Sequence, residues 1–295
     1  MLDHLCSLVG ARRPIEICAK ASKYLFGGLR ASPRREAREV IDHAITDAME
    51  KWGIALSDVS RLRGGGAKLF PVRNGFILRC RMGLRPTTKR FFKVHEIAHI
   101  LFYDLNAEIP LRLFPFTPAE EIMCNKISRE TLLPDLFVGG SLDKILSRYP
   151  QIDVRSIDTL ARSLQVIPWQ IIKRVLDRGE DAEYAALYWR CIGEGTAFQV
   201  IDVQSPYGIY LPLREKSQKD EHTHRGVWTA ASTGHFFGPD EVELGSITKT
   251  LLVASFAVSD PWQSVIEVIE LDEALRLRAK MWRESRGSLY PFHSH

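Results

Sequence analysis

Apolar residues in the first part of the chain have the spacing of helices and, further along, of short strands. Residues 33–52 carry apolar side chains three or four positions apart, which is the spacing of a helix buried along one face. Two short apolar runs follow at residues 69–72 and 76–78, and the Asn74-Gly75 pair between them is a strong signal for a tight turn. We therefore predict a helix followed by a β-hairpin.

Two further helices are predicted after this hairpin. Residues 91–105 carry apolar side chains at helical spacing. Residues 118–133 read as the next helix, because Thr117 and the proline after it suit a helix start and Pro134 suits a helix end.

Residues 141–180 contain three apolar clusters at helical spacing. These clusters lie near residues 142–146, 157–164 and 171–176. Short helices joined by short turns are typical of a helix-turn-helix, although Gln165 occupies the turn position where glycine is usual. We predict a small helix-turn-helix-like unit.

The last part of the chain is expected to be rich in strands. The segments with strand character are residues 198–203, 208–211, 227–230, 251–258 and 265–271. A terminal helix is predicted over residues 272–282. This order of elements indicates a small α+β domain with a mostly antiparallel sheet.

The whole chain is therefore predicted to have an α+β fold in three parts. The expected domains are residues 1–140, the helical unit at residues 141–180, and a C-terminal α+β domain at residues 181–295. With 295 residues and 45% apolar composition, the chain is sufficient for one large or two to three small globular domains.

Charge is unevenly distributed along the chain, although the net charge of +4 is small. Residues 1–115 contain 20 Lys and Arg against 11 Asp and Glu, whereas the remainder contains 20 against 25. One basic stretch comprises Arg79, Arg81, Arg85, Lys89 and Arg90. Such a stretch could contact the phosphates of a nucleic acid, or it could form one solvated face of a strand.

The cysteines favour a reducing environment. The five are Cys6, Cys18, Cys80, Cys124 and Cys191, and none forms a C-x-x-C pair. An odd number of scattered cysteines is not the pattern of a disulfide scaffold. We also find neither a signal peptide nor an apolar run of about 20 residues. The expectation is a cytoplasmic protein with no membrane partner.

The strongest chemical signal is the segment His95-Glu96-Ile97-Ala98-His99. Two histidines four positions apart lie on one helix face, so both imidazoles can reach one ion. Zinc suits two neutral imidazoles plus a carboxylate, with a fourth position left for water. Glu96 would lie beside that position, where it can take a proton from water and return it to a leaving amine. The alternative is a buried helix with two incidental histidines.

A third ligand is expected from the next predicted helix. Glu121 is our choice, and Glu120 is the alternative. The glutamate that is not a ligand would still be favoured near a helix N-terminus by the helix dipole. Asn125 lies one turn after Glu121 and could orient a ligating histidine through a hydrogen bond.

Other side chains are secondary candidates. Tyr103 could donate a hydrogen bond to the oxyanion that develops during hydrolysis, with simple packing as the alternative. Cys124 or Cys80 could ligate zinc at the open position and hold the enzyme inactive, with a role as a small buried residue as the alternative. His222 and His224 could bind metal, but their surroundings are typical of a polar loop.

Two segments resemble the ImmA/IrrE family of metallopeptidases. They read R-F-F-K-V-H-E-I-A-H at residues 90–99 and E-I-M-C-N-K-I-S-R-E-T-L-L-P at residues 121–134. The typical family forms are R-x-F-T-x-A-H-E-x-G-H and E-x-x-x-N-x-x-A-x-x-L-L-x-P. The chain departs from these forms at Ala98, where the family usually has Gly, and at Val94, where it usually has Ala. The resemblance covers roughly residues 35–180.

This resemblance implies a zincin-like domain in which His95, His99 and Glu121 are the ligands and Glu96 is the general base. Family members cleave a partner repressor that carries a helix-turn-helix, and so release genes for stress response or antiphage defence. In IrrE-like members a GAF-like sensory domain follows the helical unit, which would be residues 181–295 here. A nucleic acid activator is a further expectation, and manganese can replace zinc at such a site.

Two other functions are alternatives. The chain could be a non-catalytic DNA-binding or ligand-sensing regulator that keeps a zincin scaffold, although a scaffold has no use for a general base at Glu96. It could also be a protease of broad specificity or a toxin, which would degrade unrelated unfolded proteins. The helix-turn-helix-like unit could itself read DNA, but in this family it is expected to pack on the peptidase and contact the substrate.

Overall fold

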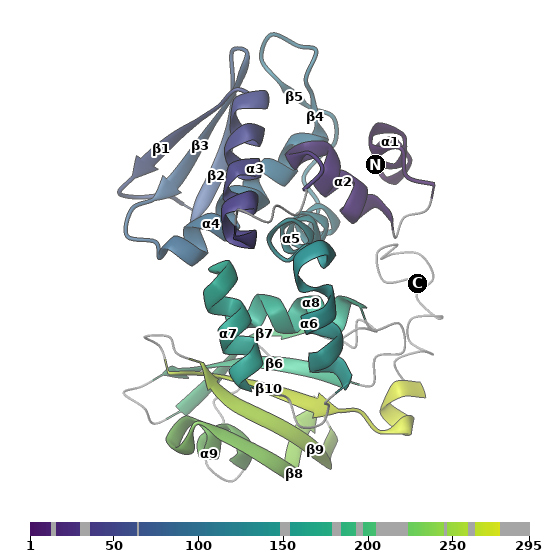
Figure 1. Ribbon diagram of the computed structural model, residues 1–295, viewed down its shortest axis with the longest axis vertical. Coiled ribbons are helices and arrows are strands. Elements are labelled where there is room, and N and C mark those ends of the chain that lie inside the picture. Colours follow the sequence, from purple (N-terminus) through teal and green to yellow (C-terminus); the bar gives the residue numbers. More distant parts are fainter. Residues whose placement is uncertain are drawn as a thin grey trace. The chain divides into compact units, whose positions relative to one another are not determined.

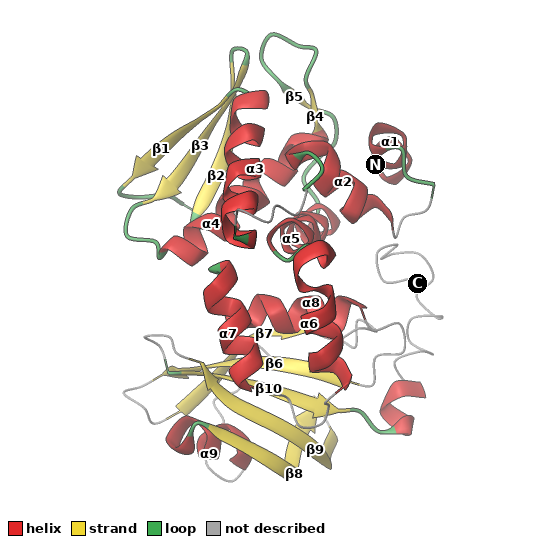
Figure 2. Cartoon of the chain, viewed as in Figure 1, coloured by secondary structure: helices red, strands yellow, loops and turns green. Residues whose placement is uncertain are grey.

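The computed structural model contains two compact units, each with its own sheet (Figure 1). It describes residues 1–12, 16–29, 36–63, 65–147, 154–178, 184–192, 197–204, 224–244, 247–258 and 263–277. The first unit contains residues 1–140 and 159–167, and the second contains residues 141–158 and 168–294. Helices and strands are both abundant (Figure 2), which confirms the predicted α+β class.

A three-stranded sheet forms one side of the first unit. Its strands are β1 (Ile54–Val59), β2 (Ala67–Val72) and β3 (Gly75–Arg81), in the order β1-β3-β2. Strands β2 and β3 are antiparallel, and Asn74 adopts the left-handed conformation (φ 62°) in the turn that joins them. The predicted hairpin is confirmed, whereas the parallel pairing of β1 with β3 was not anticipated.

Five helices accompany this sheet in the described part of the first unit up to Leu132. They are α1 (Leu2–Val9), α2 (Ile17–Phe26), α3 (Ala37–Lys51), α4 (Pro86–Ala98) and α5 (Pro118–Leu132). Helix α4 packs against both α5 and β2. Its buried side chains include Val94, Ile97 and Ala98, while α5 buries Met123 and Ile127. This packing fixes how far α4 and α5 are rotated about their own axes.

The bounds of α4 differ from the predicted helix over residues 91–105. The helix begins at Pro86, because proline suits a first turn, and its α-helical part ends at Ala98. A 3-10 turn (η2, His99–Phe102) continues it, and Tyr103 then enters an extended conformation. Strands β4 (Tyr103–Asp104) and β5 (Leu111–Arg112) form a short antiparallel ladder after that turn.

Three helices occupy the part of the chain predicted to be a helix-turn-helix-like unit. They are α6 (Asp135–Ser147), α7 (Val154–Leu164) and α8 (Pro168–Arg178). Gln165 takes a positive φ of 49° between α7 and α8, which is the conformation that glycine usually supplies at such a turn. The three helices are confirmed, while the division into three domains stays a prediction.

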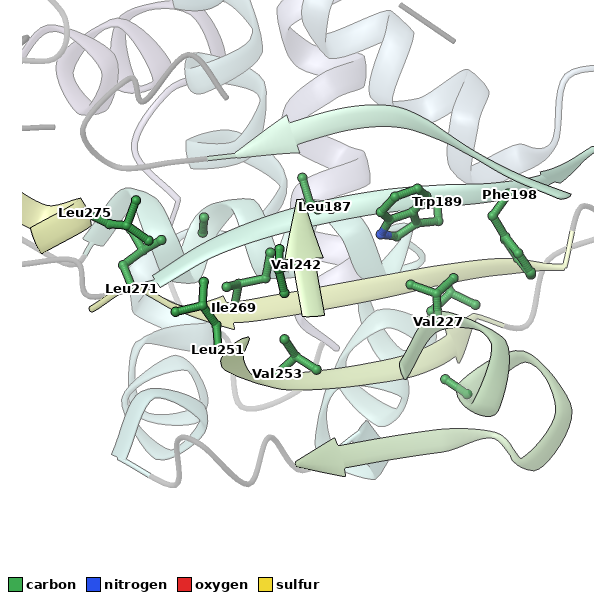
Figure 3. Close-up of a cluster of buried hydrophobic side chains, with 13 residues drawn as sticks. Leu187, Trp189, Phe198, Val227, Val242, Leu251, Val253, Ile269, Leu271 and Leu275 are labelled. Carbon is green, nitrogen blue, oxygen red and sulfur yellow. The ribbon is translucent and has the colours of Figure 1, made fainter. Parts of the chain in front are cut away.

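The second unit contains a five-stranded antiparallel sheet. Its strands are β6 (Tyr184–Ile192), β7 (Ala197–Gln204), β8 (His235–Leu244), β9 (Ile247–Val258) and β10 (Ser264–Glu270), in the order β7-β6-β10-β9-β8. Helix α9 (Arg225–Thr233) packs on strands β8, β9 and β10. Figure 3 shows the apolar side chains of the sheet, among them Leu187, Trp189 and Val253, gathered beside Val227 of this helix.

One prediction for this unit is wrong, and others are tested only in part. Residues 227–230 were expected to be a strand but lie in α9, which buries Gly226, Val227 and Ala230 at helical spacing. The predicted strand at residues 208–211 lies outside the described residues. The terminal helix predicted over residues 272–282 is described as far as Leu277. No helix among the described residues is both long and apolar enough to cross a membrane.

Candidate metal centre

Three of the predicted site residues converge where α4 packs against α5. The Nε2 atoms of His95 and His99 lie 3.2 Å apart. One carboxylate oxygen of Glu121 lies 3.1 Å from Nε2 of His95, and the other lies 3.4 Å from Nε2 of His99. Both histidines are buried, whereas Glu121 is partly open to solvent. The site therefore combines an enclosed side with an accessible one.

These distances fit the ligand set of a tetrahedral metal ion. Ligand atoms bonded to zinc at about 2.0–2.1 Å in tetrahedral geometry lie about 3.3 Å from one another, and the Nε2 atoms of the two histidines lie 3.2 Å apart. The two oxygens of Glu121 lie 3.1 Å and 3.4 Å from one histidine each, so this carboxylate faces both imidazoles. Ligand atoms of His95, Glu96 and His99 also lie within 4.8 Å of one another. This group of His95, Glu96 and His99 could hold a metal ion. Two imidazoles and a carboxylate, as in His95, His99 and Glu121, are a ligand set that suits zinc.

Electrostatics also favour a cation at this point. Hydrogen bonds from His95 and His99 lower the pKa of Glu121 well below its ordinary value. Burial lowers the pKa of His99, but its hydrogen bonds to Glu120 and Glu121 act in the opposite direction, and the net shift of the pKa is upward. Without a metal, a proton on His99 supplies the positive charge that the cluster requires. A metal ion must displace that proton, so metal affinity should fall as the pH falls.

A second carboxylate orients His99 from the opposite side of its ring. An oxygen of Glu120 lies 2.6 Å from Nδ1 of His99, and the other oxygen accepts a hydrogen bond from Arg112. Glu120 is fully buried at the first turn of α5. A carboxylate that accepts the Nδ1–H of a ligating histidine fixes its tautomer and aims Nε2 at the metal. Glu120 is thus not placed as a ligand, since it faces Nδ1.

Glu96 faces the sheet side of the site. Its Oε2 accepts a hydrogen bond from the backbone N–H of Leu69 in β2, at 2.9 Å, which leaves Oε1 available for another partner. Burial raises the pKa of the Glu96 carboxyl, although His99, His95 and the Leu69 N–H act in the opposite direction. A raised carboxyl pKa brings proton exchange closer to neutral pH.

Tyr103 does not contact the converging side chains in the described structure. Its ring packs edge-on against Phe76, with 5.3 Å between the ring centroids, and the guanidinium of Arg112 lies 5.3 Å from its centroid. These contacts agree with the packing alternative. The oxyanion role of Tyr103 stays a prediction.

Neither cysteine named as an inhibitory ligand belongs to the converging group. Cys124 is buried, and its Sγ lies 3.5 Å from Nδ1 of His99, on the side of the ring where Glu120 binds. Burial raises the pKa of Cys124 to about 11, which keeps the thiol protonated. Cys80 is buried in β3, where burial likewise raises the pKa of its thiol. The inhibitory role of either thiol stays a prediction.

The remaining predicted candidates are Asn125, His222 and His224. For the Asn125 side chain, no hydrogen bond is present among the described residues, and Glu120 fills the orienting role for His99. His224 is fully buried, with Nδ1 3.1 Å from an oxygen of the equally buried Glu267. Glu267 also accepts the indole N–H of Trp189 at 3.0 Å. His222 lies outside the described residues.

The predicted basic stretch separates into exposed and buried cations. Arg90 is buried and donates to Asp42 at 2.6 Å and to the carbonyl of Leu164. Lys89 pairs with Asp58 at 2.7 Å. Arg79 and Arg81 remain exposed on β3. Only part of the stretch is therefore available to a partner.

Comparison with known proteins finds no family and a distant structural similarity. No family model matches the chain, and no curated protein matches it. Among solved structures, the chain is similar to a Mycobacterium tuberculosis transcriptional regulator, with 13% sequence identity and a TM-score of 0.49. The match covers 98% of this chain and 83% of that one.

Proposed function

We propose that this protein is a zinc-dependent endopeptidase whose centre is formed by His95, His99 and Glu121. The observation that carries the proposal is the convergence of the two Nε2 atoms and the Glu121 carboxylate at separations of 3.1 to 3.4 Å. The presence of Glu96 between the two histidines separates this arrangement from a purely structural zinc site, which has no need of a proton acceptor.

The chain's own residues support peptide hydrolysis in distinct ways. When bound, zinc supplies Lewis acidity to a water molecule and to a peptide carbonyl. Glu96, held through Oε2 by the Leu69 N–H, would accept a proton from the attacking water on Oε1 and would return it to the leaving amine. Glu120 holds the His99 ring in place, and Arg112 holds Glu120. Manganese is an alternative metal for the same ligands.

We propose a transcriptional repressor with a helix-turn-helix as the substrate, cleaved to release stress or defence genes. The support is the resemblance of residues 90–99 and 121–134 to the ImmA/IrrE motifs. A zincin-like fold for the first unit and a GAF-like signal-receiving role for the C-terminal sheet belong to the same proposal. The C-terminal part would then control when the repressor is cut.

The proposal can be tested by mapping new protein N-termini in cells that express the wild-type chain or Glu96→Gln. We expect one or a few new N-termini that depend on Glu96 and lie in a helix-turn-helix repressor. Glu96-dependent cuts in many unrelated proteins would favour the broad-specificity protease. If zinc-loaded wild type produces no Glu96-dependent cut, the non-catalytic regulator becomes the better account.

DNA reading by the helix-turn-helix-like unit is less well supported. Lys173 of α8 pairs with Asp202 at 2.5 Å, and Arg174 is buried. Trp169 at the start of α8 stacks on Tyr188 of β6, with 5.5 Å between the ring centroids. Helix α8 thus uses Lys173 and Trp169 within its own unit, and Arg174 is not exposed. Little positive charge is left on it for phosphate contacts.

A nucleic acid activator would find a better surface on β2 and β3. Lys68 and Arg79 are register partners on these strands, and both are exposed. Their cationic groups lie 5.6 Å and 4.8 Å from the ring centroid of Phe70. Neither forms an ion pair in the described part of the chain. Exposed cations beside an aromatic ring suit a single strand, and its binding should weaken steeply with salt.

A further inference from the structure

Exposed apolar side chains are concentrated in the segment between α4 and α5. Of the eleven exposed large apolar residues in the described structure, five lie within residues 105–116. They are Leu105, Ile109, Leu111, Leu113 and Phe116, called here the apolar hairpin surface. Single exposed apolar residues are common, whereas a concentration of this kind marks an interaction site.

This surface is held in a fixed position beside the metal centre. The Phe116 ring lies 6.4 Å from the ring of His99, yet 59% of Phe116 remains exposed. Arg112 of β5 binds Glu120, the residue that orients His99. The apolar hairpin surface therefore begins at the metal centre.

Backbone hydrogen bonds anchor the hairpin at both ends. The N–H of Leu113 donates to the carbonyl of Phe102 at 2.9 Å, next to the metal-binding turn. At the far end, the N–H of Asn74 donates to the carbonyl of Glu108 at 2.8 Å, and Arg73 pairs with Glu108. An anchored hairpin can present its side chains with little further loss of conformational entropy on binding.

The backbone of β5 indicates the shape of the partner. Among the described residues, β5 pairs only with β4, so its other edge is free to accept another strand. Leu111 is the register partner of Asp104, while Arg112 is the partner of Tyr103. Arg112 turns towards Tyr103 and Glu120, so Leu111 lies on the opposite face, where 61% of it is exposed.

We propose that the apolar hairpin surface binds an extended apolar segment of the substrate chain and so guides it to the metal centre. The inference rests on the proposed peptidase function and adds the substrate class to it. A strand edge supplies backbone hydrogen bonds to any extended peptide, and exposed apolar side chains beside it select for apolar residues. The segment recognised is one that alternates apolar residues in an extended conformation.

The binding test uses the full chain carrying Glu96→Gln, so that binding is measured without cleavage. Two fluorescently labelled synthetic peptides of equal length are compared by anisotropy, one with leucine at alternate positions and one with serine there. We expect the leucine peptide to bind more tightly. Leu111→Ser should weaken its binding by about tenfold. Met82→Ser should not, although Met82 is an equally exposed apolar residue (61%) elsewhere in the same unit.

Several results would overturn the proposal. Equal affinity for the two peptides, no binding of either, or equal effects of Leu111→Ser and Met82→Ser would each exclude selective docking on this surface. Sedimentation of the chain tests whether a second copy of the chain occupies this surface instead of a peptide. If Leu111→Ser converted a dimer into a monomer, the surface would be an interface between two copies of the chain.

Cleavage by the zinc-loaded wild-type chain separates this proposal from the proposed function. Selective binding of the leucine peptide without its cleavage, together with no Glu96-dependent cut in cells, would keep the docking surface and remove the peptidase. Cleavage of both peptides at equal rates, unaffected by Leu111→Ser, would keep the peptidase and remove the docking surface. Faster cleavage of the leucine peptide, slowed by Leu111→Ser, supports both.

Discussion

Replacing Glu120 by glutamine should weaken metal binding without removing any ligand. Glu120 accepts hydrogen bonds from two donors, the Nδ1–H of His99 and the guanidinium of Arg112. A glutamine of nearly the same shape has one acceptor oxygen and one donor NH2 group. It can therefore serve one of these donors only, and it presents an N–H to the other.

The size of this effect follows from the role of a residue that orients a ligand. Changes at such residues lower metal affinity by about 10- to 100-fold, which corresponds to about 1.4–2.8 kcal/mol of binding free energy. We place Glu120→Gln within this range because its side chain is fully buried and water cannot replace the lost acceptor. Glu121→Gln should cost more, since it changes a ligand.

The assay is competition for zinc between the full chain and a chromophoric chelator. Glu108→Gln is a matched control, because Glu108 lies on the same hairpin as Arg112 and forms an exposed ion pair with Arg73 of the β2–β3 turn. We expect wild-type affinity for this control and a 10- to 100-fold loss for Glu120→Gln. Wild-type affinity in Glu120→Gln, with its metal-free thermal stability unchanged, would refute the orienting role. A complete loss equal to that of Glu121→Gln would instead indicate that Glu120 is a ligand.

Three further predictions follow from the structure. Glu96→Gln should retain zinc by elemental analysis while peptide cleavage falls by about 10²- to 10⁴-fold, and retained activity would exclude Glu96 as the general base. Gly53→Ala should lower the free energy of unfolding by about 1–3 kcal/mol, because Gly53 has φ 59° and an added Cβ would lie 2.8 Å from the carbonyl oxygen of Asn74. Gly83→Ala, at φ 77° with open space around it, should cost less in the same denaturation experiment. Glu267→Ala should destabilise the C-terminal unit by about 3–5 kcal/mol, because it leaves buried His224 and the Trp189 indole without their partner. An effect no larger than that of Glu273→Ala, at an exposed position, would contradict this.

The part of the site that depends on helical spacing was accessible from the sequence. His95 and His99 are four residues apart, so one helix brings both Nε2 atoms to the same point. The sequence determined less clearly whether Glu120 or Glu121 is the third metal ligand. Adjacent residues on a helix point about 100° apart, so only one of them can face the ion. Which one faces it depends on the rotation of α5, and the burial of Met123 and Ile127 sets that rotation.

Other features depended on tertiary contacts that the sequence pattern does not contain. Arg112 reaches Glu120 only because β5 pairs with β4, and no spacing in the sequence predicts this contact. The misassigned strand at residues 227–230 has β-favouring Val227 and Trp228, but their burial against the sheet occurs in a helix. The helix predicted over residues 91–105 ended too late, because apolar residues continue through the 3-10 turn that follows its α-helical part.

Metal stoichiometry tests the central claim most directly. Elemental analysis of the purified full chain should find about one zinc per chain in the wild type. The exposed-histidine control His43→Ala should keep it, whereas His95→Ala and Glu121→Ala should lose it. No zinc in the wild type and none taken up on titration would contradict the account, as would retention of zinc in His95→Ala.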